Sequence, residues 1–166
     1  MPEKTEEETP KKSLISRLEE EGDVAADYLE GLLDIADLDG DIDIDVENER
    51  AALAIAGGKL GHLVGERGEV LDALQELTRL AVHTSLGERS RLMLDIDNFR
   101  SSKKEELAKL AHEIAEEVKS TGAQIKLKPM NAFERKVIHD TIQEIGLTSE
   151  SEGEEPNRCV VVLPQE

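Results

Sequence analysis

Residues 57–77 read GGKLGHLVGERGEVLDALQEL, and this stretch decides the fold of the first half of the chain. Two glycines, Gly65 and Gly68, bracket the polar pair Glu66-Arg67. Apolar residues precede the turn, and after it they recur at helical spacing at Val70, Leu74, Leu77 and Ala81. The pattern predicts a short helix, a glycine turn and a longer helix, all packed on a sheet.

The glycine turn has the features of an anion site. Glycine has no Cβ, so its backbone can approach a ligand closely. The backbone N–H groups at the start of the following helix, around residues 69–71, are predicted to point at whatever binds the turn, which favours phosphate. A lone G-x-x-G pattern is common by chance, so its meaning depends on the elements around it.

Those flanking elements give a recognisable order. Residues 24–36 repeat at helical spacing behind Asp23, a candidate N-cap. Three β-like runs follow, at residues 41–47, 53–57 and 91–97. The predicted order is α-β-β-α-α-β with the glycine turn between the last two helices. The class is therefore α+β.

This order around Gly65-Glu66-Arg67-Gly68 resembles the bacterial (type II) K-homology domain, the KH module that clamps about four nucleotides of a single strand on its glycine loop. The predicted KH domain covers residues 22–98. The resemblance implies that the loop residues bind nucleic acid: Lys59, Gly65, Glu66, Arg67 and Gly68.

Charge argues for selective rather than general nucleic-acid binding. The chain has 38 acidic and 20 basic residues and a net charge of −18, whereas general nucleic-acid binders are usually basic. Residues 1–50 carry 18 of the acidic and 5 of the basic residues, so most of the negative charge precedes the glycine loop. Residues 1–21, rich in Glu, Lys, Thr and Pro, are predicted to form a disordered acidic tail.

The alternating run Asp41-Ile42-Asp43-Ile44-Asp45-Val46 invites a calcium interpretation, which its spacing rejects. An EF-hand loop needs its glycine at the sixth position and oxygen ligands at the first, third and fifth. Placing Gly40 sixth puts Ile35 first. The run is better explained as a strand with one solvated face.

The second half of the chain is predicted to form a small α/β domain at residues 99–166. Apolar residues recur at helical spacing from Ser101 or Ser102 to Gly122, and a short β-like run covers residues 124–127. Asn131 is predicted to cap the next helix, with Glu134 as its capping-box partner. On that helix the expected core stripe is Phe133, Val137, Thr141 and Ile145.

Arg135 and His139 are four residues apart and so are neighbours on the helix. At 100° per residue Arg135 is expected to border the core stripe, and His139 to point further into solvent. Spacing alone favours two exposed side chains without a particular role. A strand, residues 159–163, follows the glycine-bearing segment SESEGEEPNR.

Residues 126–163, through KPMNAFERKVIHDTI, SESEGEEPNR and CVVVLP, resemble the RxxxH (Arg-three-His) domain, a single-strand nucleic-acid-binding family with the order α-β-α-β-β. Arg135 and His139 stand at its two signature positions. The resemblance implies Arg as a phosphate fork and His as a stacking donor, with Lys128 and Arg158 extending the basic surface.

A KH domain followed by an RxxxH domain is the arrangement of the Jag family, the SpoIIIJ-associated or KhpB-type RNA-binding proteins of bacteria. The resemblance implies an RNA chaperone or post-transcriptional regulator that pairs with a small KH-only protein of the KhpA type and affects cell-wall synthesis and cell elongation. Many members carry a further N-terminal domain, and here a short acidic tail precedes the KH unit. Members usually have a basic residue where this chain has Glu66, so Glu66 is expected to weaken binding or to point away while Arg67 and Lys59 supply the cations.

The remaining signals are consistent with a cytoplasmic protein that is not an enzyme. The single cysteine, Cys159, excludes an internal disulfide and lies in an apolar run, as a core thiol does. No apolar stretch reaches the length of a membrane span. The four histidines lack ligand spacing and no P-loop pattern occurs, so neither cofactor nor metal is expected.

Two functions remain open at this point. The first is sequence-tolerant single-stranded RNA binding by both modules along one strand. The second is a protein-interaction scaffold whose KH unit mainly dimerises, which the acidity and Glu66 favour. The salt dependence of RNA affinity separates them.

Overall fold

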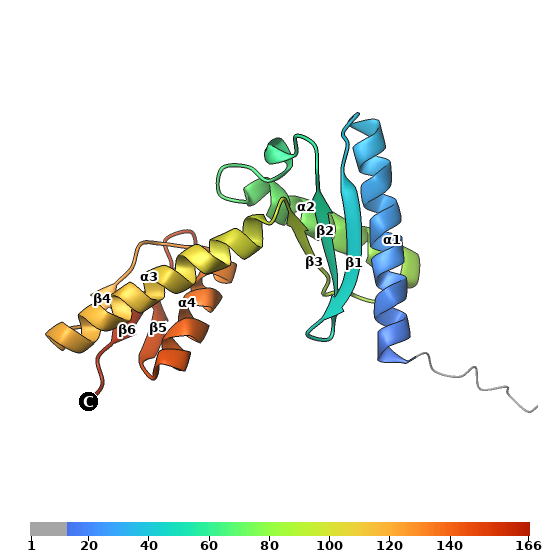
Figure 1. Cartoon of the computed structure of the whole chain (residues 1–166). Helices are drawn as coiled ribbons and strands as arrows, with labels where there is room; N and C mark the ends of the chain where they lie inside the picture. The colour runs from blue at the N-terminus through green and yellow to red at the C-terminus, as the bar shows by residue number, and fades with distance from the viewer. Residues whose placement is uncertain (1–12) are drawn as a thin grey trace, which may run out of the picture. The chain divides into compact units, whose positions relative to one another are not determined.

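The computed structural model describes residues 13–166, and the chain divides into two compact units, residues 1–99 and 100–166 (Figure 1). Each unit combines helices with a three-stranded sheet. The α+β class predicted from the sequence is confirmed. The division falls close to the predicted boundary after Asn98.

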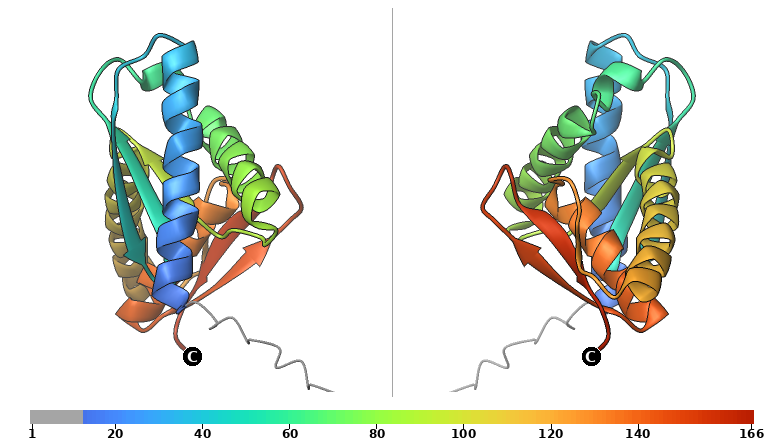
Figure 2. Two further views of the ribbon diagram at one scale, coloured as in Figure 1. Left: turned by 90° about the vertical axis from the view of Figure 1, so that its right-hand side faces the viewer. Right: turned by 90° about the vertical axis from the view of Figure 1, so that its left-hand side faces the viewer.

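The first unit has the element order α1 (Leu14–Ile35), β1 (Asp41–Glu47), β2 (Arg50–Ala56), η1 (Gly61–Leu63), α2 (Glu69–Leu86) and β3 (Met93–Ile96). Strand β2 is central, antiparallel to β1 and parallel to β3. Helices α1 and α2 lie side by side on the sheet (Figure 2). The order agrees with the KH resemblance, although the predicted short helix is one turn of 3₁₀ helix, η1.

Alternation along the strands separates a core face from an acidic face. Ile42 pairs with Ile55 and Ile44 pairs with Leu53, and Ile55 and Leu53 belong to the buried core. The predicted inward residues of the third strand, Leu92, Leu94 and Ile96, are fully buried. The other face carries aspartates and small residues: Asp41, Asp43, Asp45, Ala52, Ala54 and Asp95.

Helix α1 begins at Leu14, so the prediction of a disordered tail as far as residue 21 and of an N-cap at Asp23 is wrong. Ser13 caps the helix, with its Oγ accepting the Ser16 N–H at 3.2 Å. Leu18 is buried. Arg17 pairs with Glu88 at 2.8 Å, and Glu21 accepts a hydrogen bond from Ser90. These long-range contacts stabilise helical turns that composition alone does not reveal. Residues 1–12 of the predicted tail lie outside the described part of the chain.

Side chains satisfy the outer edge of strand β3. Gln75 Oε1 accepts the Leu94 N–H at 3.0 Å, and Arg79 Nε donates to the Leu92 carbonyl at 2.9 Å. Because these residues are four apart on α2, one helix face covers both backbone groups. Further along, the Asp95 carboxylate accepts the Ile96 N–H at 2.9 Å.

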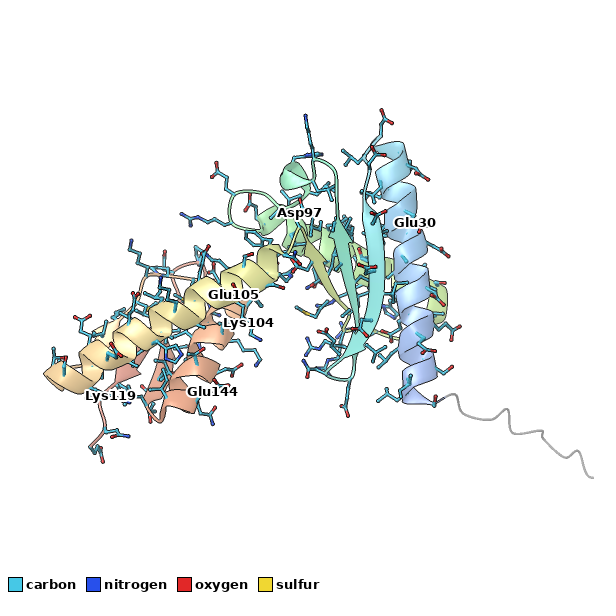
Figure 3. All side chains as sticks on the ribbon, viewed as in Figure 1. Glu30, Asp97, Lys104, Glu105, Lys119 and Glu144 are labelled. Carbon is cyan, nitrogen blue, oxygen red and sulfur yellow. The ribbon has the colours of Figure 1, made fainter. Side chains whose placement is uncertain are left out.

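The second unit is built on the order α3 (Phe99–Thr121), β4 (Ile125–Lys126), α4 (Ala132–Ile145), β5 (Thr148–Glu152) and β6 (Cys159–Leu163). Strand β6 is central and antiparallel to both neighbours. Cys159 is buried, as predicted. The exposed side of α3 is charged and includes Lys104, Glu105 and Lys119 (Figure 3).

Helix α4 confirms the predicted capping box, because Asn131 Oδ1 accepts the Glu134 N–H while Glu134 accepts the Asn131 N–H, both at 2.9 Å. Its core face differs from the predicted stripe. Ile138 and Ile142 are fully buried, whereas Phe133 and Ile145 are only partly buried. The helix contacts both β5 and β6, so its buried face is wider than a single stripe.

Candidate nucleic-acid interface

The G-x-x-G loop is held in a left-handed backbone conformation at both glycines, with φ of +83° at Gly65 and +82° at Gly68. A Cβ at Gly68 would lie 2.6 Å from Cε1 of Phe99. Gly68 is therefore required by the fold as well as by any ligand, because a side chain there would be strained and would also collide with the aromatic ring.

The N–H groups inside the loop converge on one carboxylate from the same chain. Glu66 N–H donates to Glu69 Oε1 at 3.0 Å, and Arg67 N–H donates to Glu69 Oε2 at 2.8 Å. The pKa of the Glu69 carboxyl is lowered, first by a hydrogen bond from its own N–H and next by that of Arg67, with Glu66 and the charge of Arg67 adding to the effect. The loop backbone thus binds an oxyanion.

The predicted donors at the start of α2 are engaged elsewhere. Val70 N–H and Leu71 N–H both donate to the Val64 carbonyl at 3.1 Å. The prediction that these N–H groups point at a ligand is wrong. The anion site lies one turn earlier, at Glu66 and Arg67, because the helix start folds back on the residue that precedes the loop.

Two cations border this loop without a carboxylate in ion-pair contact. Lys59 and Arg67 are exposed, and neither lies within ion-pair distance of an acidic residue in the described range 13–166. Glu66 is exposed as well. Its backbone N–H faces the bound carboxylate, which places its peptide in the anion site.

In the second unit Arg135 is buried, with 9% of its surface exposed. Its Nη1 donates to the Met130 carbonyl at 2.6 Å, and its Nη2 pairs with Glu155 Oε1 at 2.7 Å. The expectation of an open phosphate fork at this position is therefore wrong. Arg135 instead ties the β5–β6 loop to the segment that precedes α4.

His139 lies between two serines of β5, so the prediction that it points into solvent is also wrong. Nδ1 is 2.6 Å from Ser149 Oγ, and Nε2 is 2.8 Å from Ser151 Oγ. The pKa of His139 is lowered, mainly by burial, with Asp140 opposing and the charges of Arg135 and Arg158 reinforcing the shift. A neutral imidazole is thereby favoured.

The basic residues predicted around this helix remain accessible. Lys128 is exposed in the segment between β4 and α4. Arg158 is partly exposed, its Nη1 donates to the Gly153 carbonyl at 3.2 Å, and its own carbonyl accepts the Met130 N–H at 3.1 Å. Because Met130 is bonded to both Arg135 and Arg158, the structure brings Arg135, His139 and Arg158 together on one side of this unit.

Sequence reasoning missed the acidic partners of both sites, Glu69 and Glu155. Glu69 had a local signal, since a Glu in the first turn of a helix readily accepts backbone N–H groups just before it. Glu155 had none, because its partner lies on another element. Within residues 13–166 no cluster of three or more His, Cys, Asp or Glu side chains could hold a metal ion. None of the helices there is long and apolar enough to cross a membrane.

Comparison with known proteins identifies the second unit. Residues 105–164 match the RxxxH (Arg-three-His) domain family. Over 143 residues the chain is 36% identical to the RNA-binding protein KhpB of Clostridium symbiosum, which covers 84% of this chain and 64% of that protein. It is 36% identical over 137 residues to KhpB of Lactiplantibacillus plantarum and 34% over 138 residues to KhpB of Bacillus subtilis.

These alignments cover 82% and 81% of this chain, and 42% and 66% of the respective relatives. The chain thus spans between about two fifths and two thirds of the length of the relatives it matches. The similarity extends over most of both units and includes the RxxxH match. The chain belongs to the KhpB family.

Proposed function

We propose that the chain binds single-stranded RNA through the G-x-x-G loop of the first unit and the side of the second unit formed by Lys128, His139 and Arg158. One observation carries this proposal: two backbone N–H groups of the loop converge on a single carboxylate. A phosphodiester presents the same pair of oxygens sharing one negative charge. The names of the relatives, RNA-binding proteins, support the choice of RNA.

The rest of the first unit favours the loop over the sheet as the binding surface. The outer sheet face carries Asp41, Asp43 and Asp45, which repel phosphate. The chain has only three aromatic residues, so stacking on a sheet, as in other RNA-binding modules, is disfavoured. Lys59 and Arg67 supply the nearest cations.

In the second unit Arg135 acts as a positioning residue. Its hydrogen bond to Met130 and its ion pair with Glu155 fix the two segments that carry Lys128 and Arg158. The strand's phosphates then meet Lys128 and Arg158, and His139 presents a neutral ring edge beside them.

Two weak sites in one chain bind a single strand more tightly than either alone, because the second contact becomes intramolecular. This explains how a protein of net charge −18 can bind RNA usefully. Family membership supports a cytoplasmic role as an RNA chaperone or post-transcriptional regulator of cell-wall synthesis and elongation, acting with a KH-only partner.

The test is fluorescence anisotropy of the full chain with a labelled single-stranded RNA, from low to high salt. Lys59→Gln, Arg67→Gln, Lys128→Gln and Arg158→Gln should each weaken binding and reduce the slope of log affinity against log salt by about 0.7. Lys119→Gln, on the exposed side of α3, is the matched control and should change neither quantity. A chain that fails to bind at low salt contradicts the proposal.

A second candidate, a dimerisation scaffold, is favoured by the surface of α2. Val70, Leu77 and Leu80 are 37%, 51% and 59% exposed, and their spacing of seven and three places them on one helix face. Analytical ultracentrifugation with Leu77→Lys tests it. Self-association that is lost in the variant, together with absent RNA binding, supports the scaffold.

A further inference from the structure

The anion site of the G-x-x-G loop is already filled by the chain itself. Both oxygens of the Glu69 carboxylate accept loop N–H groups, at 3.0 Å from Glu66 and 2.8 Å from Arg67. The same carboxylate lies over the first glycine, since a Cβ at Gly65 would be 2.3 Å from Glu69 Oε1 and 2.6 Å from Cδ. It therefore takes both the donors and the open space that a nucleic-acid backbone would use.

Loop shape does not depend on this carboxylate. The turn is fixed from the other side by the Val64 carbonyl, which accepts two N–H groups of α2, and by Phe99 packed on Gly68. Glu69 itself is exposed in the first turn of α2. Its side chain can rotate into solvent while the loop keeps its conformation.

We infer that Glu69 is an internal competitor of the RNA backbone, and that a phosphate occupies the loop only after the Glu69 carboxylate has moved out. This inference rests on the function proposed above and adds the residue that sets the affinity of that site. A carboxylate and a phosphodiester are matched competitors, because each offers two oxygens sharing one negative charge to the same two donors.

Such competition makes the loop selective for strands over isolated anions. A free phosphate gains only the two N–H groups and must displace Glu69 to reach them. A strand also contacts Lys59, Arg67 and the second unit, so it can displace the carboxylate at a lower concentration. The wild-type loop is accordingly expected to ignore inorganic phosphate and to respond to RNA.

The test uses the full chain labelled with ¹⁵N and follows the backbone signals of Glu66 and Arg67 during titration with inorganic phosphate. In Glu69→Gln these two signals should shift at millimolar phosphate, while in the wild-type chain they should not. Single-stranded RNA should bind Glu69→Gln about fivefold more tightly, which corresponds to removal of one like charge near a phosphate in water.

Glu66→Gln is the matched control, because it removes the same charge from the same loop without vacating the two donors. It should leave the loop insensitive to phosphate and raise RNA affinity less than Glu69→Gln does. Equal gains in the two variants, with no phosphate response in either, would show that only net charge matters and would overturn the inference. The spectrum reports folding directly, and Glu69→Ala replaces the glutamine variant should that one unfold.

The result also separates this inference from the proposed function. If Glu69→Gln responds to phosphate while no form of the chain binds RNA, masking of the loop by Glu69 is supported and single-strand binding is refuted. If the wild-type chain binds RNA but the signals of Glu66 and Arg67 stay unchanged by phosphate in both Glu69 variants, the inference is wrong and the RNA-binding function stands.

Discussion

Arg135 is the residue whose structural and functional interpretations differ most. It is buried, with a carbonyl and a carboxylate as partners, and a buried partner left alone is costly. We expect Arg135→Met to lower the free energy of unfolding by about 2–3 kcal/mol, because Glu155 is partly exposed and regains water.

Urea unfolding measures this loss. Lys136→Met, which breaks an exposed pair with Asp140 on the same helix, is the control and should change stability by less than about 0.5 kcal/mol. Normal stability of Arg135→Met combined with weakened RNA binding would return Arg135 to the role of a direct phosphate contact.

His139 provides a prediction about pH. Its pKa in the folded chain lies below the usual value, mainly because of burial, so the unfolded chain takes up a proton first as pH falls. Stability should therefore be greatest above about pH 6.5 and should decline as pH drops from there through the folded pKa. Denaturant titrations between about pH 5 and 8 measure this, and His139→Gln should lack this part of the decline. The exposed His112→Gln serves as control.

At the scale of elements, the second glycine of the loop is predicted to be structural. Gly68→Ala meets both a left-handed backbone and the Phe99 ring, so we expect a loss of about 2–4 kcal/mol. Gly87→Ala, at the other end of α2, has a similar φ of +79° but open space around the new Cβ, and should lose only about 1 kcal/mol. Similar losses measured by thermal unfolding would remove the role assigned to Phe99.

The first turns of α1 give a second prediction at this scale. Leu18 is buried while Ile15 is 62% exposed. Leu18→Ala should therefore destabilise the chain by about 2–4 kcal/mol, and Ile15→Ala by less than about 0.5 kcal/mol. Equal and small losses in chemical denaturation would mean that this part of α1 contributes little to the fold.

Local patterns predicted the elements well, and long-range partners were beyond their reach. The alternation in β1, the inward residues of the third strand and the capping box of α4 depend on neighbours in sequence, and each was found. The start of α1 depends on Glu88 and Ser90, and the burial of Arg135 on Glu155. No periodicity encodes such pairs, so the predicted tail and the open Arg fork were wrong.

At the scale of the whole molecule, charge should limit where and when RNA binds. The net charge of −18 repels RNA over distances set by salt, about 10 Å at 0.1 M. Asp41→Asn with Asp43→Asn should raise RNA affinity at low ionic strength and leave it unchanged at about 0.5 M. Anisotropy titrations at both salt concentrations measure this. A gain that persists at high salt would mean that RNA contacts the sheet face.

The hydrogen bonds from α2 to strand β3 bear on how the protein avoids sticking to itself. An unpaired strand edge is a template for addition of a foreign strand. Here the Leu94 N–H, the Leu92 carbonyl and the Ile96 N–H along that edge are already occupied by side chains. An incoming strand would have to displace a glutamine, an arginine and an aspartate at once. The helix that follows the glycine loop therefore also protects this unit against amyloid-like growth.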